Sequence, residues 1–107
     1  MTEVYQVTIT VPDEAAGGVL ADELVGKRLA ACVQLLGPIR SVYRWEGKIE
    51  DNPEWMCIAK TTAGRFPALL EAVRKLHPYR VPEVLAMPAS DGNPDYLKWV
   101  ADCVKEE

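Results

Sequence analysis

The segment His77-Pro78-Tyr79-Arg80-Val81-Pro82-Glu83 concentrates side chains that can ligate a metal or exchange a proton. It contains the only histidine of the chain and two of its eight prolines. Each proline fixes its own φ and pushes the preceding residue out of helical geometry, so the segment is predicted to be stiff and extended. Imidazole is a common ligand of divalent metals, which makes His77 the leading candidate. The alternative is that His77 only binds the last carbonyls of a helix that ends there.

Further metal ligands are scarce within one chain. Cys32, Cys57 and Cys103 lie far apart in the sequence and match no CxxC or zinc-finger spacing. A metal site shared between chains would need fewer ligands from each, with His77 first and Glu83 or Cys32 as weaker candidates. The odd number of cysteines indicates reduced thiols, which are typical of a cytoplasmic protein.

Covalent and acid–base catalysis have little support in the sequence. Cys32 and Cys57 lie in apolar runs, where cysteines are usually unreactive parts of a core. The glycines form no phosphate-binding motif after a strand. Glu83 and Lys60 could form an acid–base pair, but paired surface charges are far more common. The sequence therefore predicts that the protein is not an enzyme.

Charge and hydropathy limit the classes of partner. The formal net charge is −4 and no basic run occurs, which argues against nucleic acid and against anionic membrane surfaces. No apolar stretch approaches the roughly 18 residues that span a bilayer, and the chain does not begin with a signal-peptide pattern. We therefore expect one cytoplasmic domain over residues 1–107.

The first half of the chain shows one helix among strand patterns. Val4–Val11 is rich in β-branched residues and is predicted to be a strand. Asp13 is expected to cap a helix that runs to about Leu29. Strand patterns follow over residues 30–36 and 39–45, interrupted at Gly37-Pro38. After a turn at residues 46–48 a strand resumes, is broken at residues 51–53, and continues over residues 55–62.

The second half of the chain is predicted to contain a helix, a strand and a final helix. Apolar residues recur at helical spacing from Phe66 to Leu76, so a helix is predicted there, capped by Thr61 or Thr62 and ended by His77. Residues 81–88 are expected to form the last strand. Asn93 is expected to cap a final helix, with a proline in its first position.

This order predicts an α+β fold, a ferredoxin-like βαββαβ sandwich with an extra C-terminal helix. The central hairpin, over about residues 39–62, is long and carries Tyr43, Trp45 and Trp55. Exposed aromatic residues on an unprotected sheet edge suggest that another subunit covers them. The alternative is that these rings pack under the helices of the same chain.

Seven segments, taken together and in this order, resemble the CutA family of divalent-cation-tolerance proteins over nearly the whole chain. They are Thr10–Glu14, Leu29–Val33, Ser41–Glu50, Lys60–Thr62, His77–Tyr79, Val81–Glu83 and Gly92–Leu97. The resemblance implies a tight homotrimer similar to the PII signalling proteins, with hairpins that pair between subunits. It implies a link to divalent metals such as copper and no established enzymatic reaction.

The sequence departs from the family at the proposed copper ligands. Family members with that site use a cysteine in the first strand and two consecutive histidines, whereas this chain has Ile9 and Leu76-His77. Arg80 also stands where the family usually has glutamate or glutamine. We therefore expect no firmly bound cofactor, and at most a weakly bound divalent ion such as copper at His77.

Two functions follow from these expectations. The first is weak divalent-metal binding through His77, at a cleft between the subunits of a homotrimer. The alternative is a PII-like signalling or scaffold trimer that binds a small molecule or a partner protein. The cleft is predicted to consist of His77 with aromatic and charged neighbours, namely Tyr43, Trp45, Lys60, Tyr79, Glu83 and Tyr96.

Overall fold

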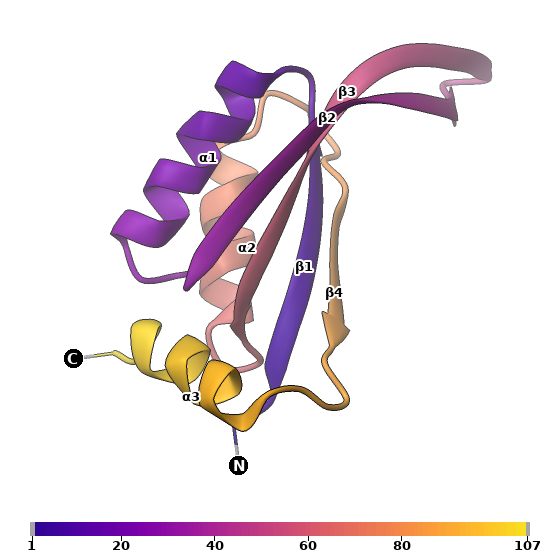
Figure 1. The fold of residues 1–107 in the computed structure, drawn as a ribbon. Coiled ribbons are helices and arrows are strands. Elements are labelled where there is room, and N and C mark those ends of the chain that lie inside the picture. Colours follow the sequence, from indigo (N-terminus) through magenta and orange to yellow (C-terminus); the bar gives the residue numbers. More distant parts are fainter. Residues whose placement is uncertain (1, 107) are drawn as a thin grey trace.

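The computed structural model describes residues 2–106 as a four-stranded antiparallel sheet with helices packed against it (Figure 1). The strand order is β2-β3-β1-β4. The elements in chain order are β1 (Val4–Val11), α1 (Glu14–Gly26), β2 (Cys32–Trp45), β3 (Lys48–Thr62), α2 (Phe66–Leu76), β4 (Val84–Pro88) and α3 (Pro94–Cys103). The predicted α+β order with an additional C-terminal helix is confirmed.

The main core lies between the sheet and helices α1 and α2. Side chains alternate between the two faces of a strand, so every second residue of β1 points toward the helices. Val7, Ile9 and Val11 are fully buried there. They pack with apolar residues of both helices, namely Leu20, Leu24, Leu69 and Val73. The apolar stripe predicted for α2 therefore forms one wall of the core.

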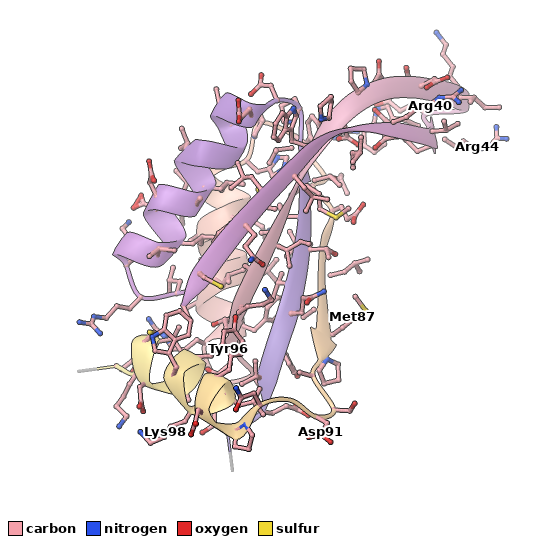
Figure 2. The ribbon with its side chains drawn as sticks, viewed as in Figure 1. Arg40, Arg44, Met87, Asp91, Tyr96 and Lys98 are labelled. Atoms are coloured by element: carbon pink, nitrogen blue, oxygen red, sulfur yellow. The ribbon has the colours of Figure 1, made fainter. Side chains whose placement is uncertain are left out.

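The opposite face of the sheet is covered only at one end. Val100 and Val104 pack there with Val4 and Ala31 in a second, smaller cluster beside α3. Farther along this face lie apolar side chains with large exposed fractions, namely Leu36 (43%), Leu85 (57%) and Met87 (51%). Figure 2 shows Met87 projecting from β4 away from α1 and α2. One chain thus leaves an apolar sheet face open.

Strands β2 and β3 form a hairpin that extends past the helices and curves away from the rest of the sheet (Figure 1). Their pairing runs from Cys32 opposite Lys60 to Trp45 opposite Lys48. The turn consists of Glu46 and Gly47, both with positive φ, at 50° and 79°. Positive φ at both central residues matches the twist of the flanking strands, and glycine adopts it without steric cost. The predicted long hairpin is confirmed.

Two predicted boundaries around α1 and β2 were wrong. Helix α1 ends at Gly26 rather than near Leu29, because Arg28 adopts a positive φ of 58° and turns the chain. The amides of Leu29 and Ala30 then both donate to the Leu24 carbonyl. Strand β2 begins at Cys32 and continues through the predicted interruption, with only a register irregularity between Leu36 and Ile39.

The predicted break in β3 was also wrong. Pro53 lies within the strand, opposite Arg40 of β2. Strand β1 pairs with β3 only as far as Trp55, so a proline at position 53 removes no hydrogen bond to β1. Strand β4 begins at Val84 rather than at residue 81, because its pairing with β1 ends where Ile9 meets Val84.

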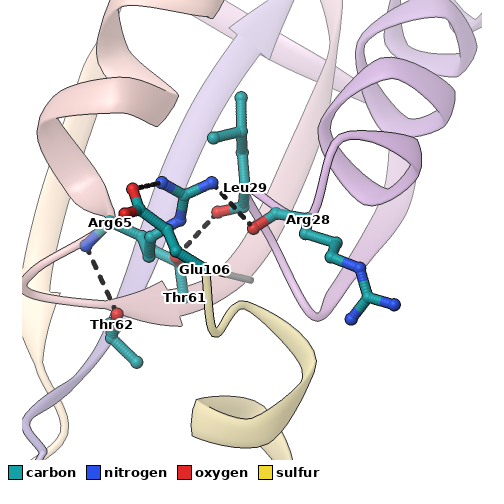
Figure 3. Close-up of polar contacts among 6 residues, drawn as sticks. All are labelled: Arg28, Leu29, Thr61, Thr62, Arg65 and Glu106. Atoms are coloured by element: carbon teal, nitrogen blue, oxygen red, sulfur yellow. Dashed lines mark hydrogen bonds and ion pairs between the residues drawn. The ribbon is translucent and has the colours of Figure 1, made fainter.

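The start of α2 is fixed differently from the prediction. Its first flanking residue is Arg65, which makes no side-chain cap. Thr62 accepts a hydrogen bond from the Arg65 amide, and the Thr61 hydroxyl donates to the Leu29 carbonyl (Figure 3). The Arg65 guanidinium pairs with Glu106 and donates to the Arg28 carbonyl. Arg65 thus joins the end of α1, the start of α2 and the residues after α3.

Candidate functional site

A cavity of about 430 Å³ lies where the hairpin meets the segment after α2, and we call it the hairpin-base cavity. Strand β2 supplies Tyr43 and Trp45, which share one face of the strand because they are two residues apart. Strand β3 supplies Glu54. The opposite wall is the segment Pro78–Val81. The structure therefore brings together three of the predicted cleft residues, Tyr43, Trp45 and Tyr79.

Glu54 is a buried carboxylate in the wall of this cavity, with only 6% of its surface exposed. The Tyr79 hydroxyl donates a hydrogen bond of 2.8 Å to its Oε2 atom. Burial raises the pKa of Tyr79, and the hydrogen bond and charge of Glu54 raise it further. Sequence reasoning missed Glu54. The signal available was the hairpin register, which places Glu54 opposite Ile39, on the same face as Tyr43.

Arg80 places a cation at the mouth of the cavity. Its guanidinium carbon lies 5.6 Å from the centroid of the Trp45 ring. Its Nη2 atom lies 3.3 Å from a carboxylate oxygen of Glu46, in the hairpin turn. A cation over an indole face is attracted by the negative charge of the ring surface. Arg80 therefore links the segment after α2 to the outer part of the hairpin.

His77 is buried beside the cavity, with 8% of its surface exposed. Its Nε2 lies 2.7 Å from the Thr10 carbonyl oxygen, and its Nδ1 accepts from the Tyr79 amide at 3.0 Å. A carbonyl can only accept, so Nε2 must carry the hydrogen and Nδ1 must present its lone pair to Tyr79. His77 also ends α2, as predicted, and its backbone amide donates a hydrogen bond to the Val73 carbonyl. Both ring nitrogens are engaged.

The remaining predicted site residues lie elsewhere in the chain. The Lys60 ammonium donates to Gln34 at 2.8 Å, on the face of the sheet opposite α1 and α2. The Tyr96 hydroxyl contacts the Cys32 sulfur at 3.6 Å (Figure 2 labels Tyr96 on α3). Burial, with the Cys32 contact as a second cause, raises the pKa of Tyr96 to about 12.

The predicted cleft is therefore divided within one chain. Tyr43, Trp45 and Tyr79 line the hairpin-base cavity, with His77 beside it. Tyr96 lies on α3 and contacts Cys32, the residue opposite Lys60, and the exposed Glu83 does not line the cavity. Among residues 2–106, no three His, Cys, Asp or Glu side chains lie close enough together to hold a metal ion.

Comparison with known proteins gives the family. Residues 5–103 match the model of the CutA1 divalent ion tolerance proteins. The chain belongs to the CutA1 family. The resemblance noted in the sequence is thereby confirmed.

Individual CutA relatives agree with this assignment. The chain is 45% identical over 96 residues to the divalent-cation tolerance protein CutA of Thermus thermophilus, covering 90% of this chain and 93% of that protein. A solved structure of the Thermus thermophilus protein has a TM-score of 0.91, with 44% identity over 98% of this chain and all of the other. The mouse protein CutA is 49% identical over 86% of this chain, which spans only 52% of the mouse protein.

One CutA relative is described with a compartment other than the predicted one. A solved CutA structure from Archaeoglobus fulgidus, described as periplasmic, has a TM-score of 0.92 and 34% identity over 95% of this chain and 99% of the other. Among residues 2–106 of the present chain, no helix is long and apolar enough to cross a membrane.

Proposed function

We propose that this CutA family member acts in divalent-cation tolerance as a homotrimer that binds a small ligand at clefts between its subunits. The observation that carries the proposal is the hairpin-base cavity, where aromatic rings surround a buried carboxylate. Ligand sites are typically concave, largely apolar and furnished with a few polar groups. The odd number of cysteines, together with their wide spacing in the sequence, supports a cytoplasmic location.

Assembly is supported by the surfaces that one chain leaves uncovered. Leu36, Leu85 and Met87 project from the open sheet face, and the far part of the hairpin extends beyond the chain's own helices. Large exposed apolar patches usually mark contacts with other chains. A further copy of this chain would cover both features, as the resemblance to PII-like trimers implies.

A homotrimer would also bring together the two groups of predicted cleft residues that lie apart within one chain. Tyr43, Trp45 and Tyr79 lie at the hairpin base, whereas Lys60 and Tyr96 lie toward α3. The two groups belong to different parts of an elongated chain that measures 44 × 25 × 21 Å. We propose that Tyr96 of one subunit faces the hairpin base of the next and completes the cleft, whereas Lys60 keeps its hydrogen bond to Gln34.

Copper binding through His77 is the competing proposal. It requires the imidazole to release either the Thr10 carbonyl or the Tyr79 amide, because a metal needs a free nitrogen lone pair. The loss of one of these hydrogen bonds would make binding of copper weak. Titration calorimetry with Cu²⁺ tests it: a heat of binding that disappears in His77→Ala supports the ligand assignment, and identical isotherms for the two proteins contradict it.

The assembly is tested by light scattering after gel filtration at micromolar concentration. We expect three times the chain mass of 11.9 kDa. The variant Leu85→Glu places a charge on the open sheet face and should reduce the trimer fraction. Its matched control is Val19→Glu, because Val19 lies on α1 and has the same exposed fraction of 57%. A monomeric wild type, or equal behaviour of the two variants, would contradict the proposed interface.

A further inference from the structure

We propose that the hairpin-base cavity recognises a small organic ammonium group, with the Glu54 carboxylate as its counter-charge. The inference rests on the proposed use of this cavity as a binding site, and it adds the chemical class of the ligand. Four features carry it: the burial of Glu54, the absence of a paired cation among the described residues, the aromatic walls and the position of Arg80.

The charge of Glu54 is not balanced within the described chain. Its side chain is buried, and among residues 2–106 the ion pairs of the structure all use other carboxylates. The Tyr79 hydroxyl supplies a hydrogen bond but no positive charge. Carboxylates removed from water are costly unless a cation and hydrogen-bond donors replace the water. An ammonium group supplies both.

The walls of the cavity suit a cation carried on an apolar body. Tyr43, Trp45 and Tyr79 contribute aromatic rings, and Pro78 and Val81 contribute apolar surface. Aromatic faces attract ammonium and guanidinium groups, more strongly when water is excluded. The volume of about 430 Å³ lies within the range of small-molecule sites. Hydrocarbon of the ligand can pack against the apolar surface while its ammonium meets Glu54.

Arg80 shows that one wall already receives a cation. Its guanidinium lies over Trp45, but it pairs with Glu46 rather than with Glu54. Both partners of that pair are exposed, so Arg80 can move away from the mouth of the cavity at little cost. Arg80 therefore occupies the Trp45 face and would compete there with a cationic ligand. It does not neutralise the buried carboxylate of Glu54.

Other ligand chemistries fit the cavity less well. An anion would meet the negative charge of Glu54, and like charges repel strongly at a buried site. A bare divalent metal would find one carboxylate and phenolic oxygens, whereas Mg²⁺ and Ca²⁺ take six or more oxygen ligands. An ammonium group needs only one carboxylate and the ring faces, which are the groups present.

The test uses the assembled wild-type protein and three probes of matched shape: benzylamine, benzyl alcohol and benzoate, at pH 7.5. Benzylamine is charged at that pH, and the alcohol is its neutral counterpart. Fluorine NMR of protein containing fluorotryptophan shows whether a probe binds in the hairpin-base cavity, because Trp45 lines this cavity whereas Trp55 and Trp99 do not. We expect benzylamine to shift the Trp45 signal saturably and the other two probes to bind at least tenfold more weakly.

Two variants test the role of the carboxylate. Glu54→Gln removes the charge and keeps an oxygen that can accept from Tyr79, so benzylamine affinity should fall at least tenfold. Glu14→Gln is the matched control, since Glu14 is exposed at the start of α1, and it should bind like wild type. If Glu54→Gln fails to assemble, the comparison of the three probes in the wild-type protein still decides whether the cavity prefers an ammonium group.

The inference is wrong if benzyl alcohol or benzoate binds as tightly as benzylamine, or if Glu54→Gln retains full affinity. In those cases a different ligand class uses the cavity and the proposed binding function stands. If no probe, and no small molecule from a cell extract, changes the Trp45 signal of the trimer, then the proposed binding function fails as well. Loss of the trimer itself would be seen separately by light scattering.

Discussion

The imidazole of His77 lies against the end of β1, with 2.7 Å between its Nε2 atom and the Thr10 carbonyl oxygen. The same ring accepts the Tyr79 amide through Nδ1, so one buried side chain joins β1 to the segment after α2. That segment carries the Tyr79 hydroxyl to Glu54 in the hairpin-base cavity. His77 is thus a positioning residue for the cavity wall.

Removing the His77 ring should destabilise the protein markedly. His77→Ala loses both hydrogen bonds and leaves the Thr10 carbonyl without its side-chain partner, so we expect the free energy of unfolding to fall by about 2–3 kcal/mol. Urea denaturation measures the change. Leu76→Ala is the control, because the neighbouring Leu76 is 40% exposed, and it should cost less than half as much. Equal losses would mean that the imidazole contacts contribute little.

Tyr79 should make stability depend on alkaline pH. Its pKa is raised by burial first and by Glu54 second, whereas an unfolded tyrosine ionises near pH 10. The stabilisation that protonated Tyr79 gives the folded state is therefore complete below about pH 10, and it declines as the pH rises above that value. Tyr79→Phe should be less stable than wild type by about 1–2 kcal/mol at pH 8, and the difference should shrink at pH 11. Denaturant titrations at the two pH values measure it, and a constant difference would refute the linkage.

Two adjacent glycines of α1 should respond in opposite directions to alanine. A Cβ atom on Gly17 would lie 2.8 Å from the Leu35 side chain and 3.3 Å from Val11, whereas one on Gly18 would meet nothing within 4 Å. Gly17→Ala should therefore destabilise by about 1–3 kcal/mol through overpacking. Gly18→Ala should stabilise by about 0.5–1 kcal/mol because alanine favours a helix. Thermal unfolding of both variants tests the pair, and the same sign in both would contradict it.

Arg80 should compete with a cationic ligand. Arg80→Gln removes the guanidinium from the Trp45 face, and a cation–π contact of about 0.5–1 kcal/mol corresponds to a two- to fivefold gain in benzylamine affinity. The fluorine signal of Trp45 reports the titration. Arg74→Gln on α2 is the charge-matched control and should leave the affinity unchanged. Weaker binding by Arg80→Gln would mean that Arg80 assists the ligand rather than competing with it.

The fold was predictable from the sequence where a residue pattern extends over a whole element. The periodic residues from Phe66 to Leu76 and the alternation in β1 identify α2 and the central strand. The errors occurred where the tertiary environment overrides local preference. Pro53 is tolerated because no β1 residue lies beside it, and α1 ends early because Arg28 adopts a positive φ.

The candidate site was predictable only in part. Tyr43, Trp45 and Tyr79, which line one cavity, could be named in advance because aromatic residues and a proline-bounded segment are visible in the sequence. Glu54 was missed because one acidic residue in a strand gives no sign of burial, which depends on the hairpin register and on the Tyr79 contact. Lys60 is separated from that cavity because the strand register places it opposite Cys32, at the other end of the hairpin. Tyr96 is separated from it because α3 packs at that end of the sheet, which has no local sequence signal.

The contacts near the start of α2 have a practical consequence for protein engineering. The Glu3 carbonyl accepts from the Ala63 amide, and Glu106 pairs with Arg65, so both ends of the described chain are held beside residues 63–65. Figure 1 shows these ends on the side of the sheet remote from the hairpin. A short linker could therefore join them in a circular permutant whose new ends lie between Glu46 and Gly47.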